Sequence, residues 1–395
     1  MRVENKELPS IYEIIGFLLI VSIWAFNEEK YITYPIKIVF ILVYGYYWLR
    51  NLHDTINKYQ GWCLLMCIAS FFATFVAEDT SVAIHTFINV LQCFLIAFTL
   101  SAYLQEKGQV VQFLKYLAFG GLILFIRLLL VTPVSVWTSF SRLGAEIGYN
   151  ANDVGNKAAI AAIVSICLFR NRAEAHRKFY ALLYIFLTVI VLFSGSRKAL
   201  LALIVATIMI YTVGLEKKQY LIFSVIGLII VLYIGYQYIM TNSSLYQTIG
   251  RRIESMINVA FYGGSEASSI DLREKYMTLA WSFIKRSPIF GVGLGNFASM
   301  SGLGIYCHCD YLEVMCSYGI PIALLYYFPV VYLLLRGLTQ KNKNTLDYSC
   351  IIICVVLIIS FVTMVMYVSA YTQMIVAIIF AYFKSIDNTL ADEYL

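Results

Sequence analysis

Charged residues are scarce in this sequence. Only 13% of its 395 residues are Asp, Glu, Lys or Arg, while 61% are hydrophobic and the mean hydropathy is +0.76. A soluble domain of this size carries roughly 25% charged residues. The low charge argues against a chain that folds in water around one polar-surfaced domain. It predicts an integral membrane protein with almost no soluble part.

Linkers and processing signals are also lacking. The chain holds only six prolines and has no low-complexity tract or long Pro- or Ser-rich segment. Its first apolar stretch, residues 11–26, has no convincing small-residue cleavage site, so we expect a retained span. The formal charge of +6 reflects orientation in a membrane before it indicates nucleic-acid binding. No platform of interleaved aromatic and basic residues is visible, and nucleic acid is not an expected partner.

Cysteine is present, but its positions do not indicate a disulfide framework. Most of the nine cysteines lie inside apolar runs, where Cys behaves as a small apolar residue. Three, namely Cys307, Cys309 and Cys316, lie in or beside a polar loop. The run Cys307-His308-Cys309-Asp310 contains side chains of the kinds that bind metals. Adjacent ligands rarely point at one centre, and no second cluster supplies the missing ligands. The sequence therefore predicts neither a metal nor a cofactor.

Long apolar runs occupy most of the chain. A helix of roughly 17–25 apolar residues crosses a hydrocarbon core of ~30 Å. The sequence predicts an all-α, polytopic membrane protein, with residues 1–395 as a single transmembrane domain of about 12 helices. The expected spans are 11–26, 34–50, 61–77, 82–104, 111–132, 157–170, 178–194, 199–214, 219–240, 313–335, 348–367 and 370–384.

Lys and Arg set the expected orientation. Most of those in short loops fall on one side of the membrane when the N-terminus is cytoplasmic, and long loops obey this rule weakly. We therefore expect both termini in the cytoplasm. Three connections then face outward, namely 133–156, 194–198 and a long extracytoplasmic loop at 241–312. Residues 245–261 and 271–284 of this loop have helix-like apolar spacing, which favours two helices on the membrane surface.

Arginine is concentrated on the expected outer side, against the orientation rule. Its planar guanidinium binds phosphate through two parallel hydrogen bonds and stays charged. Pairing with acidic residues, or snorkelling, is the ordinary alternative for any one of them. Arg197 is different, because Ser194-Gly195-Ser196-Arg197 is a tight turn with no acidic neighbour in sequence. A cluster that converged on one cavity would bind a phosphate or diphosphate. The outer arginines include Arg142, Arg197, Arg273 and Arg286.

Histidine is rare, and only His308 of the four lies in the long outer loop. A neutral imidazole is the natural general base near neutral pH. A lone histidine is often only structural. Its position just before the tenth expected span makes His308 the candidate base.

These residues resemble the core signature of the O-antigen ligase and polymerase superfamily, bacterial enzymes that transfer lipid-linked glycans. Their order and expected topology match, although each motif is short. The family often has Asn, an acidic residue and Gly where this chain has Cys309, Ser317 and Ile322. The matching segments are 288–297 (PIFGVGLGNF), His308-x-x-Tyr311-Leu312-Glu313, Gly319-Ile320, the 194–197 turn, and Arg142 followed by Asn150 and Asn152.

The resemblance implies a bacterial inner-membrane glycosyltransferase that uses neither metal nor cofactor. Its donor would be a polyprenyl-diphosphate-linked glycan and its acceptor a second glycan, within membrane lipids. A flippase and a chain-length regulator are further implied partners. His308 and Arg197 would be catalytic. The implied substrate-binding residues are Arg142, Arg273, Arg286, Asn152, Ser196 and Glu313.

Three functions remain as alternatives at this point. A repeat-unit polymerase for O-antigen or capsular polysaccharide is favoured, mainly because such polymerases are varied and common. A ligase would instead transfer the glycan to lipid A-core or to a protein. A polysaccharide or lipid transporter would be expected to have two similar halves, and the sequence has no internal repeat.

Overall fold

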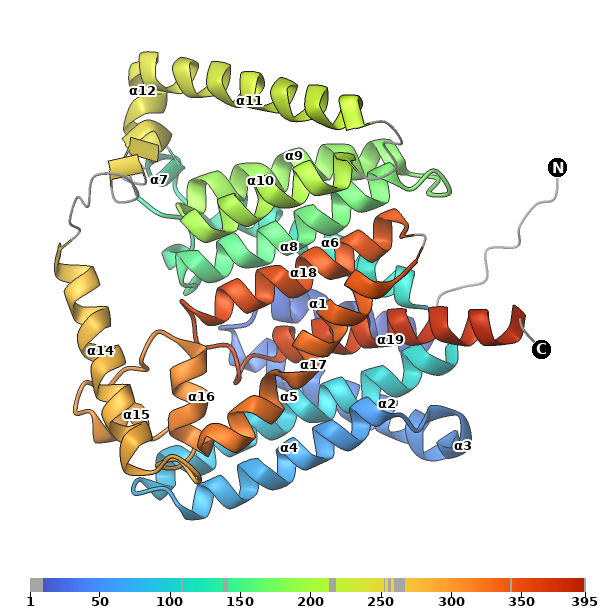
Figure 1. Cartoon of the computed structure of the whole chain (residues 1–395), viewed down its shortest axis with the longest axis vertical. Helices are drawn as coiled ribbons and strands as arrows, with labels where there is room; N and C mark the ends of the chain where they lie inside the picture. Colours follow the sequence, from blue (N-terminus) through green and yellow to red (C-terminus); the bar gives the residue numbers. More distant parts are fainter. Residues whose placement is uncertain are drawn as a thin grey trace.

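The computed structural model describes residues 10–107, 109–137, 141–212, 218–251, 253–254, 257–258, 267–341 and 343–393. Within these ranges the chain is helical and has no strand. The long helices run roughly parallel to one another in a bundle (Figure 1). The prediction of an all-α, polytopic membrane protein is confirmed.

A helix coincides with each of the twelve expected spans. Six of the described helices are long and apolar enough to cross a membrane, namely α2, α5 (to Gln105), α6, α8, α9 and α17, and α1 and α18 are shorter apolar helices. The twelve are α1 (Ile11–Ala25), α2 (Lys30–Arg50), α4 (Lys58–Phe75), α5 (Thr80–Lys107), α6 (Val110–Val131), α8 (Ala151–Arg170), α9 (Arg177–Ser194), α10 (Arg197–Thr212), α11 (Lys218–Thr241), α17 (Ile320–Thr339), α18 (Thr345–Phe361) and α19 (Ala370–Glu393).

The tenth expected span, 313–335, is broken near its start. The chain forms a separate nine-residue helix, α16 (Asp310–Tyr318), before α17 begins. Gly319 has φ +81°, and a Cβ there would lie 2.1 Å from the Ile289 carbonyl oxygen, so only glycine fits. Backbone hydrogen bonds from Val292 to Cys316 (2.7 Å) and from Ile320 to Pro288 (2.8 Å) hold the glycine-rich segment against this break.

The long loop contributes a helix that runs across the ends of the bundle helices. This helix, α14 (Ala267–Arg286), contains the expected helix 271–284 and packs on α16 (Figure 1). The other expected helix, 245–261, lies partly outside the described residues. The short elements are α3 (Leu52–Thr55), α7 (Val134–Trp137), η1 (Ala145–Ile147), α12 (Ser243–Leu245), η2 (Tyr246–Gly250, a π-helical turn) and α15 (Phe297–Met300).

The central helix of the bundle is α8. Every residue from Val154 to Leu168 is buried, and α8 packs against α6, α9, α10 and α18. A helix that is apolar and buried on all sides belongs in the core of a large bundle. Small residues permit the close packing, since a Cβ on Gly121 of α6 would lie 2.5 Å from the Ala161 Cβ. Because the core holds α8 firmly, its first turn is a rigid platform for polar side chains.

Candidate functional site

The turn that carries Arg197 is shaped by its two small neighbours. Helix α9 ends at Ser194, and Gly195 adopts the left-handed conformation (φ +61°) that commonly ends a helix. The turn lies directly against α8, because a Cβ on Gly155 would lie 2.6 Å from the Ser196 Cβ. Arg197 follows as the first, half-buried residue of α10. The Ser196 hydroxyl is buried and has no hydrogen-bond partner among the described residues.

Arg142 joins this turn to the start of α8. Its Nε donates to the Ser194 carbonyl oxygen at 2.9 Å, and its Nη2 donates to Asn152 Oδ1 at 2.8 Å. Asn152 is itself placed by the helix cap, since its N–H donates to Asn150 Oδ1 at 2.8 Å. The structure therefore brings Arg142, Asn152 and the Ser194–Arg197 turn together, although they come from three separate segments.

Two lysines lie close to the Ser194–Arg197 turn, which is here called the arginine turn. Lys198 is half-buried, and its Nζ donates to Thr363 Oγ1, in the connection between α18 and α19, at 2.5 Å. Lys157 is buried on α8, pairs with Asp153 at 2.8 Å and lies over the Tyr149 ring at 4.3 Å. Sequence reasoning missed both. For Lys198 a signal existed, because it directly follows Arg197 at the mouth of a span.

His308 lies on a strained loop. Its φ of +60° makes it the one non-glycine residue with positive φ in the part of the chain that the structure describes. The imidazole stacks on Tyr276 of α14 at 5.7 Å between ring centroids, and Tyr306 meets it edge-on at 4.6 Å. Burial and the positive charge of Arg273 lower the pKa of His308. A lowered pKa favours the neutral ring, which is the form that a general base needs.

A buried carboxyl group on α16 accepts a hydrogen bond from the loop of His308. Glu313 of α16 is buried, and its Oε2 accepts the Cys307 N–H at 2.9 Å. The Cys307 thiol donates to the Cys309 carbonyl oxygen at 3.0 Å, which closes the turn around His308. Burial raises the pKa of Glu313. Glu313 thus contacts the backbone beside His308, and direct contact with substrate, as expected from the sequence, stays a prediction.

A second carboxylate, Asp310, was not recognised in the sequence. It is fully buried at the start of α16, and its Oδ1 accepts the N–H groups of Met366 at 2.6 Å and Tyr367 at 2.9 Å. Its Oδ2 accepts the Tyr327 hydroxyl at 3.0 Å. Burial outweighs these three donors and raises the pKa of Asp310 to about 7. The only sequence signal was an acidic residue two positions after His308.

Charge interactions relate the arginine turn to the loop of His308. Arg273 of α14 acts electrostatically on both His308 and Lys198. Asp153 acts in the same way on Lys198 and on Tyr306. A geometric link between the two groups is the connection between α18 and α19, where Thr363 accepts from Lys198 at 2.5 Å and the Met366 N–H donates to Asp310 at 2.6 Å.

Arg286 lies outside this group. It is the last residue of α14, thirteen positions beyond Arg273, or roughly 20 Å along a helix. Its Nη2 pairs with Glu78 at 2.9 Å, and both side chains are mostly exposed. Arg286 is thus the predicted site residue that the structure does not bring to the others.

No three His, Cys, Asp or Glu side chains converge on one point within the described ranges. The cysteines beside His308 are buried and free, and burial raises the pKa of both the Cys307 and the Cys309 thiol. The expectation that the protein needs no metal stays a prediction.

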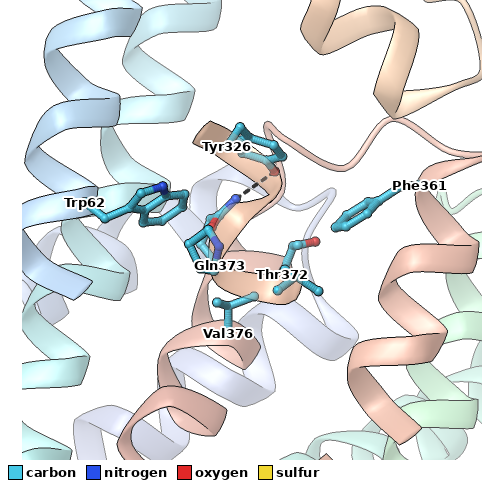
Figure 2. A pocket seen from close by; sticks show the side chains of 8 residues that line it. Trp62, Tyr326, Phe361, Thr372, Gln373 and Val376 are labelled. Atoms are coloured by element: carbon cyan, nitrogen blue, oxygen red, sulfur yellow. Dashed lines mark hydrogen bonds between the residues drawn. The ribbon is translucent and has the colours of Figure 1, made fainter. Parts of the chain in front are cut away.

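A small cavity lies inside the bundle, between side chains of α4, α17, α18 and α19 (Figure 2). Phe361, whose ring contacts Tyr327, forms one wall, and Gln373 Nε2 donates to the Tyr326 hydroxyl at 2.9 Å. The buried Thr372 hydroxyl has no partner among the described residues. The space suits about one water molecule and no substrate. It is lined by Trp62, Tyr326, Pro329, Val330, Phe361, Thr372, Gln373 and Val376.

These features define a polytopic helical membrane protein in which basic residues and a histidine make up a candidate site. Over residues 182–327 the chain matches the family model described as O-antigen ligase. The matched region contains Arg197, Arg273 and His308, whereas Arg142 and Asn152 precede it. No curated protein matches the chain. The match confirms the resemblance to the O-antigen ligase and polymerase superfamily and supports a function of that general type, by glycosyl transfer.

Proposed function

We propose that this protein polymerises polyprenyl-diphosphate-linked oligosaccharide repeat units into O-antigen or capsular polysaccharide. The observation that carries the proposal is that residues 362–369 contact both sides of the site, through Thr363 to Lys198 at 2.5 Å and through Met366 to Asp310 at 2.6 Å. One side of the site is cationic and suits a diphosphate. The other side offers a neutral imidazole to an acceptor hydroxyl.

The reaction requires only a cationic side that binds the diphosphate and a base that accepts the proton of the acceptor hydroxyl. The acceptor hydroxyl transfers its proton to His308 while its oxygen forms a bond to the anomeric carbon of the donor sugar. The bond from that carbon to the diphosphate oxygen breaks, and polyprenyl diphosphate leaves. Attack from the face opposite the leaving group inverts the anomeric centre. Because a diphosphate is already a good leaving group, the reaction does not need the pair of carboxyl groups that a glycosidase uses, one of which protonates the leaving group.

Arginines would supply the main electrostatic stabilisation. Negative charge grows on the diphosphate as the glycosidic bond breaks, and fixed donors in a site shielded from water stabilise it by several kcal/mol. Arg197, which is half-buried, and Arg273, which is exposed, are the residues proposed for this role. Arg142 is already bonded to Ser194 and Asn152, so its contribution is chiefly to hold the turn that presents Arg197.

The proposed location is the bacterial inner membrane, with the site on its outer side and both termini in the cytoplasm. The support is the Lys and Arg distribution of the short loops. Reporter fusions at Ser265, which lies outside the described residues, and at the C-terminus should read outside and inside, respectively. The same compartment for both would overturn this topology.

Genetic deletion separates the proposed polymerase from a ligase. Loss of a polymerase leaves single repeat units on the envelope acceptor. Loss of a ligase leaves the acceptor bare while long lipid-linked polymer accumulates. A gene neighbourhood with a flippase and a chain-length regulator would further support the polymerase and its proposed partners.

A reconstituted assay tests the chemistry itself. The purified protein should join two synthetic polyprenyl-diphosphate repeat units and release one polyprenyl diphosphate per bond formed. Transport of the donor across vesicles without any new glycosidic bond would favour the transporter alternative. The arginines would then serve transport and not catalysis.

A further inference from the structure

The connection between α18 and α19 touches both sides of the site. This segment, residues 362–369, is here called the bridging loop. Near its start, Thr363 Oγ1 accepts from Lys198 Nζ at 2.5 Å. Near its end, the N–H groups of Met366 and Tyr367 donate to Asp310 Oδ1 at 2.6 and 2.9 Å. Lys198 directly follows Arg197, and Asp310 lies two residues after His308.

We propose that the bridging loop is a positioning element that fixes the separation between the arginine turn and the His308 loop. This inference rests on the proposed function, because it concerns the geometry of the same reaction. Lys198 and Asp310 are its two anchors, and neither needs to touch a substrate. Both act through the loop, one on the placement of Arg197 and the other on that of His308.

The anchors suit this role because each is shielded from solvent. Asp310 is fully buried and Lys198 is half-buried, so each contact forms in a medium of low dielectric constant. Asp310 accepts three hydrogen bonds at once, two of them from neighbouring backbone groups. Such a group holds a loop more firmly than a single exposed contact does.

The bridging loop is also rigid in itself. Backbone N–H groups of Thr363 and Met364 donate to the Ser360 carbonyl oxygen at 3.0 and 3.1 Å, and Ser369 donates to Met366 at 3.0 Å. Asn156 Nδ2 of α8 donates to Met364 Sδ at 3.3 Å. The loop therefore transmits the position of one anchor to the other, with the buried helix α8 as support.

The consequence for the reaction is geometric. The general base must reach the acceptor hydroxyl while the arginines grip the diphosphate on the far side of the same anomeric carbon. An error of 1 Å in such an arrangement costs roughly 10²-fold in rate, because the reacting atoms no longer meet in line. Donor affinity depends on the internal geometry of the arginine turn, which Arg142 holds through Ser194 and Asn152 without the bridging loop, and it should change little.

The first variant pair isolates the Lys198 anchor. Thr363→Val removes the acceptor while keeping the shape, and Thr363→Ser keeps the hydroxyl as a matched control. We expect kcat of Thr363→Val to fall roughly 10-fold or more, with the donor Kd within about twofold of wild type. Thr363→Ser should retain most of kcat. Equal kcat for Val and Ser variants, or a loss in donor affinity alone, would overturn the inference.

A double variant tests whether the anchors act through one element. Asp310→Asn weakens the other anchor at nearly constant volume, and faster hydrogen exchange at the Met366 and Tyr367 amides reports its release. If both anchors fix the same loop, Thr363→Val with Asp310→Asn should be hardly slower than the slower single variant. If the fold-losses in kcat of the two single variants multiplied in the double variant, the two substitutions would be independent structural defects, and the inference would be overturned.

Failure of this inference is distinguishable from failure of the proposed function. A wild-type protein without glycosyl transfer would refute the function. Transfer that survives at wild-type kcat in the folded double variant would refute only the positioning role. Thermal unfolding of each variant in the same detergent provides the fraction of folded protein by which kcat is corrected.

Discussion

The two sides of the candidate site are held by different forces. On the arginine side, Arg142 binds a backbone carbonyl and a neutral amide, and Gly195 supplies the turn. On the histidine side, the backbone is held by the buried carboxyl groups of Glu313 and Asp310. The first arrangement depends on helix packing and on hydrogen bonds to neutral groups. The second depends on charge, and its failure should appear as lost catalysis before lost binding.

The largest effect is expected from His308→Ala. A general base contributes roughly 10²–10⁴-fold to the rate, and kcat should fall by that amount. The donor Kd should stay near the wild-type value, because the base acts on the acceptor. Turnover and donor binding by the purified variant check this, once its folding has been verified. Near-normal turnover in a folded variant would remove His308 as the base.

Arg197→Lys tests the opposite side at nearly constant charge. Lysine lacks the fork that grips two phosphate oxygens, so we expect a roughly 10²-fold loss in kcat together with weaker donor binding. Titration with a synthetic lipid diphosphate measures the binding part. Full activity of the lysine variant would mean that Arg197 acts only as a charge and not as a bidentate ligand.

Glu313→Gln bears directly on how the histidine side is held. Glutamine keeps an oxygen for the Cys307 N–H but loses the charge that strengthens this hydrogen bond. We expect kcat to fall roughly 10-fold with unchanged donor Kd, since a hydrogen bond to a charged group is stronger by about 1 kcal/mol. Arg142→Gln provides the contrast, because it should weaken donor binding as the turn loosens. The same pattern for both variants would erase the distinction between the two sides.

Sequence reasoning found the arginine side more completely than the histidine side. Short-range patterns mark a helix end such as Ser194-Gly195-Ser196, so Arg197 could be singled out. The role of Asp310 depends on Met366, which lies 56 positions further along the chain. No local pattern reports such a contact. The break at Gly319 was within reach, however, because Gly319-Ile320-Pro321 is a typical helix start.

The positions of the long helices were predictable from length and hydropathy, and six of the described helices are long and apolar enough to cross a membrane. Each expected range overlaps a helix, and the main error was to start the tenth span in α16. The α16 segment is apolar enough to extend a hydrophobic run, although Asp310 and Glu313 point into the protein. A hydropathy profile averages over residue types, so it cannot show that one apolar run contains a separate buried helix followed by a longer one, and only tertiary contacts separate the two.

The pH dependence of kcat sharpens the electrostatic part of the comparison. Burial and Arg273 lower the pKa of His308, so the base stays neutral to a lower pH than an ordinary imidazole. The part of the acid limb that belongs to His308 should therefore lie below pH of about 6.5, the usual histidine value. Arg273→Gln removes the nearby positive charge, which raises the pKa of His308 and moves the acid limb to higher pH. Arg273→Lys keeps the charge, so the acid limb of its kcat profile should stay at the wild-type pH. An acid limb at the same pH in the wild type and both variants would exclude Arg273 as a cause of the lowered His308 pKa.

The smallest effect is expected from Arg286→Gln. Sequence reasoning grouped Arg286 with the other arginines, but its guanidinium pairs with Glu78 at 2.9 Å, with 65% and 57% of the two side chains exposed. An exposed ion pair contributes about 0–1 kcal/mol to stability, so the free energy of unfolding should change little in the variant. Since Arg286 lies roughly 20 Å along α14 from Arg273, it should not reach a diphosphate held by Arg197 and Arg273. Both kcat and donor Kd should remain near wild type, in contrast to Arg273→Gln measured in the same assay. A loss in donor affinity comparable to that of Arg273→Gln would mean that the bound glycan or its lipid extends along the whole of α14, and the arginine side would then have to be redrawn to include its far end.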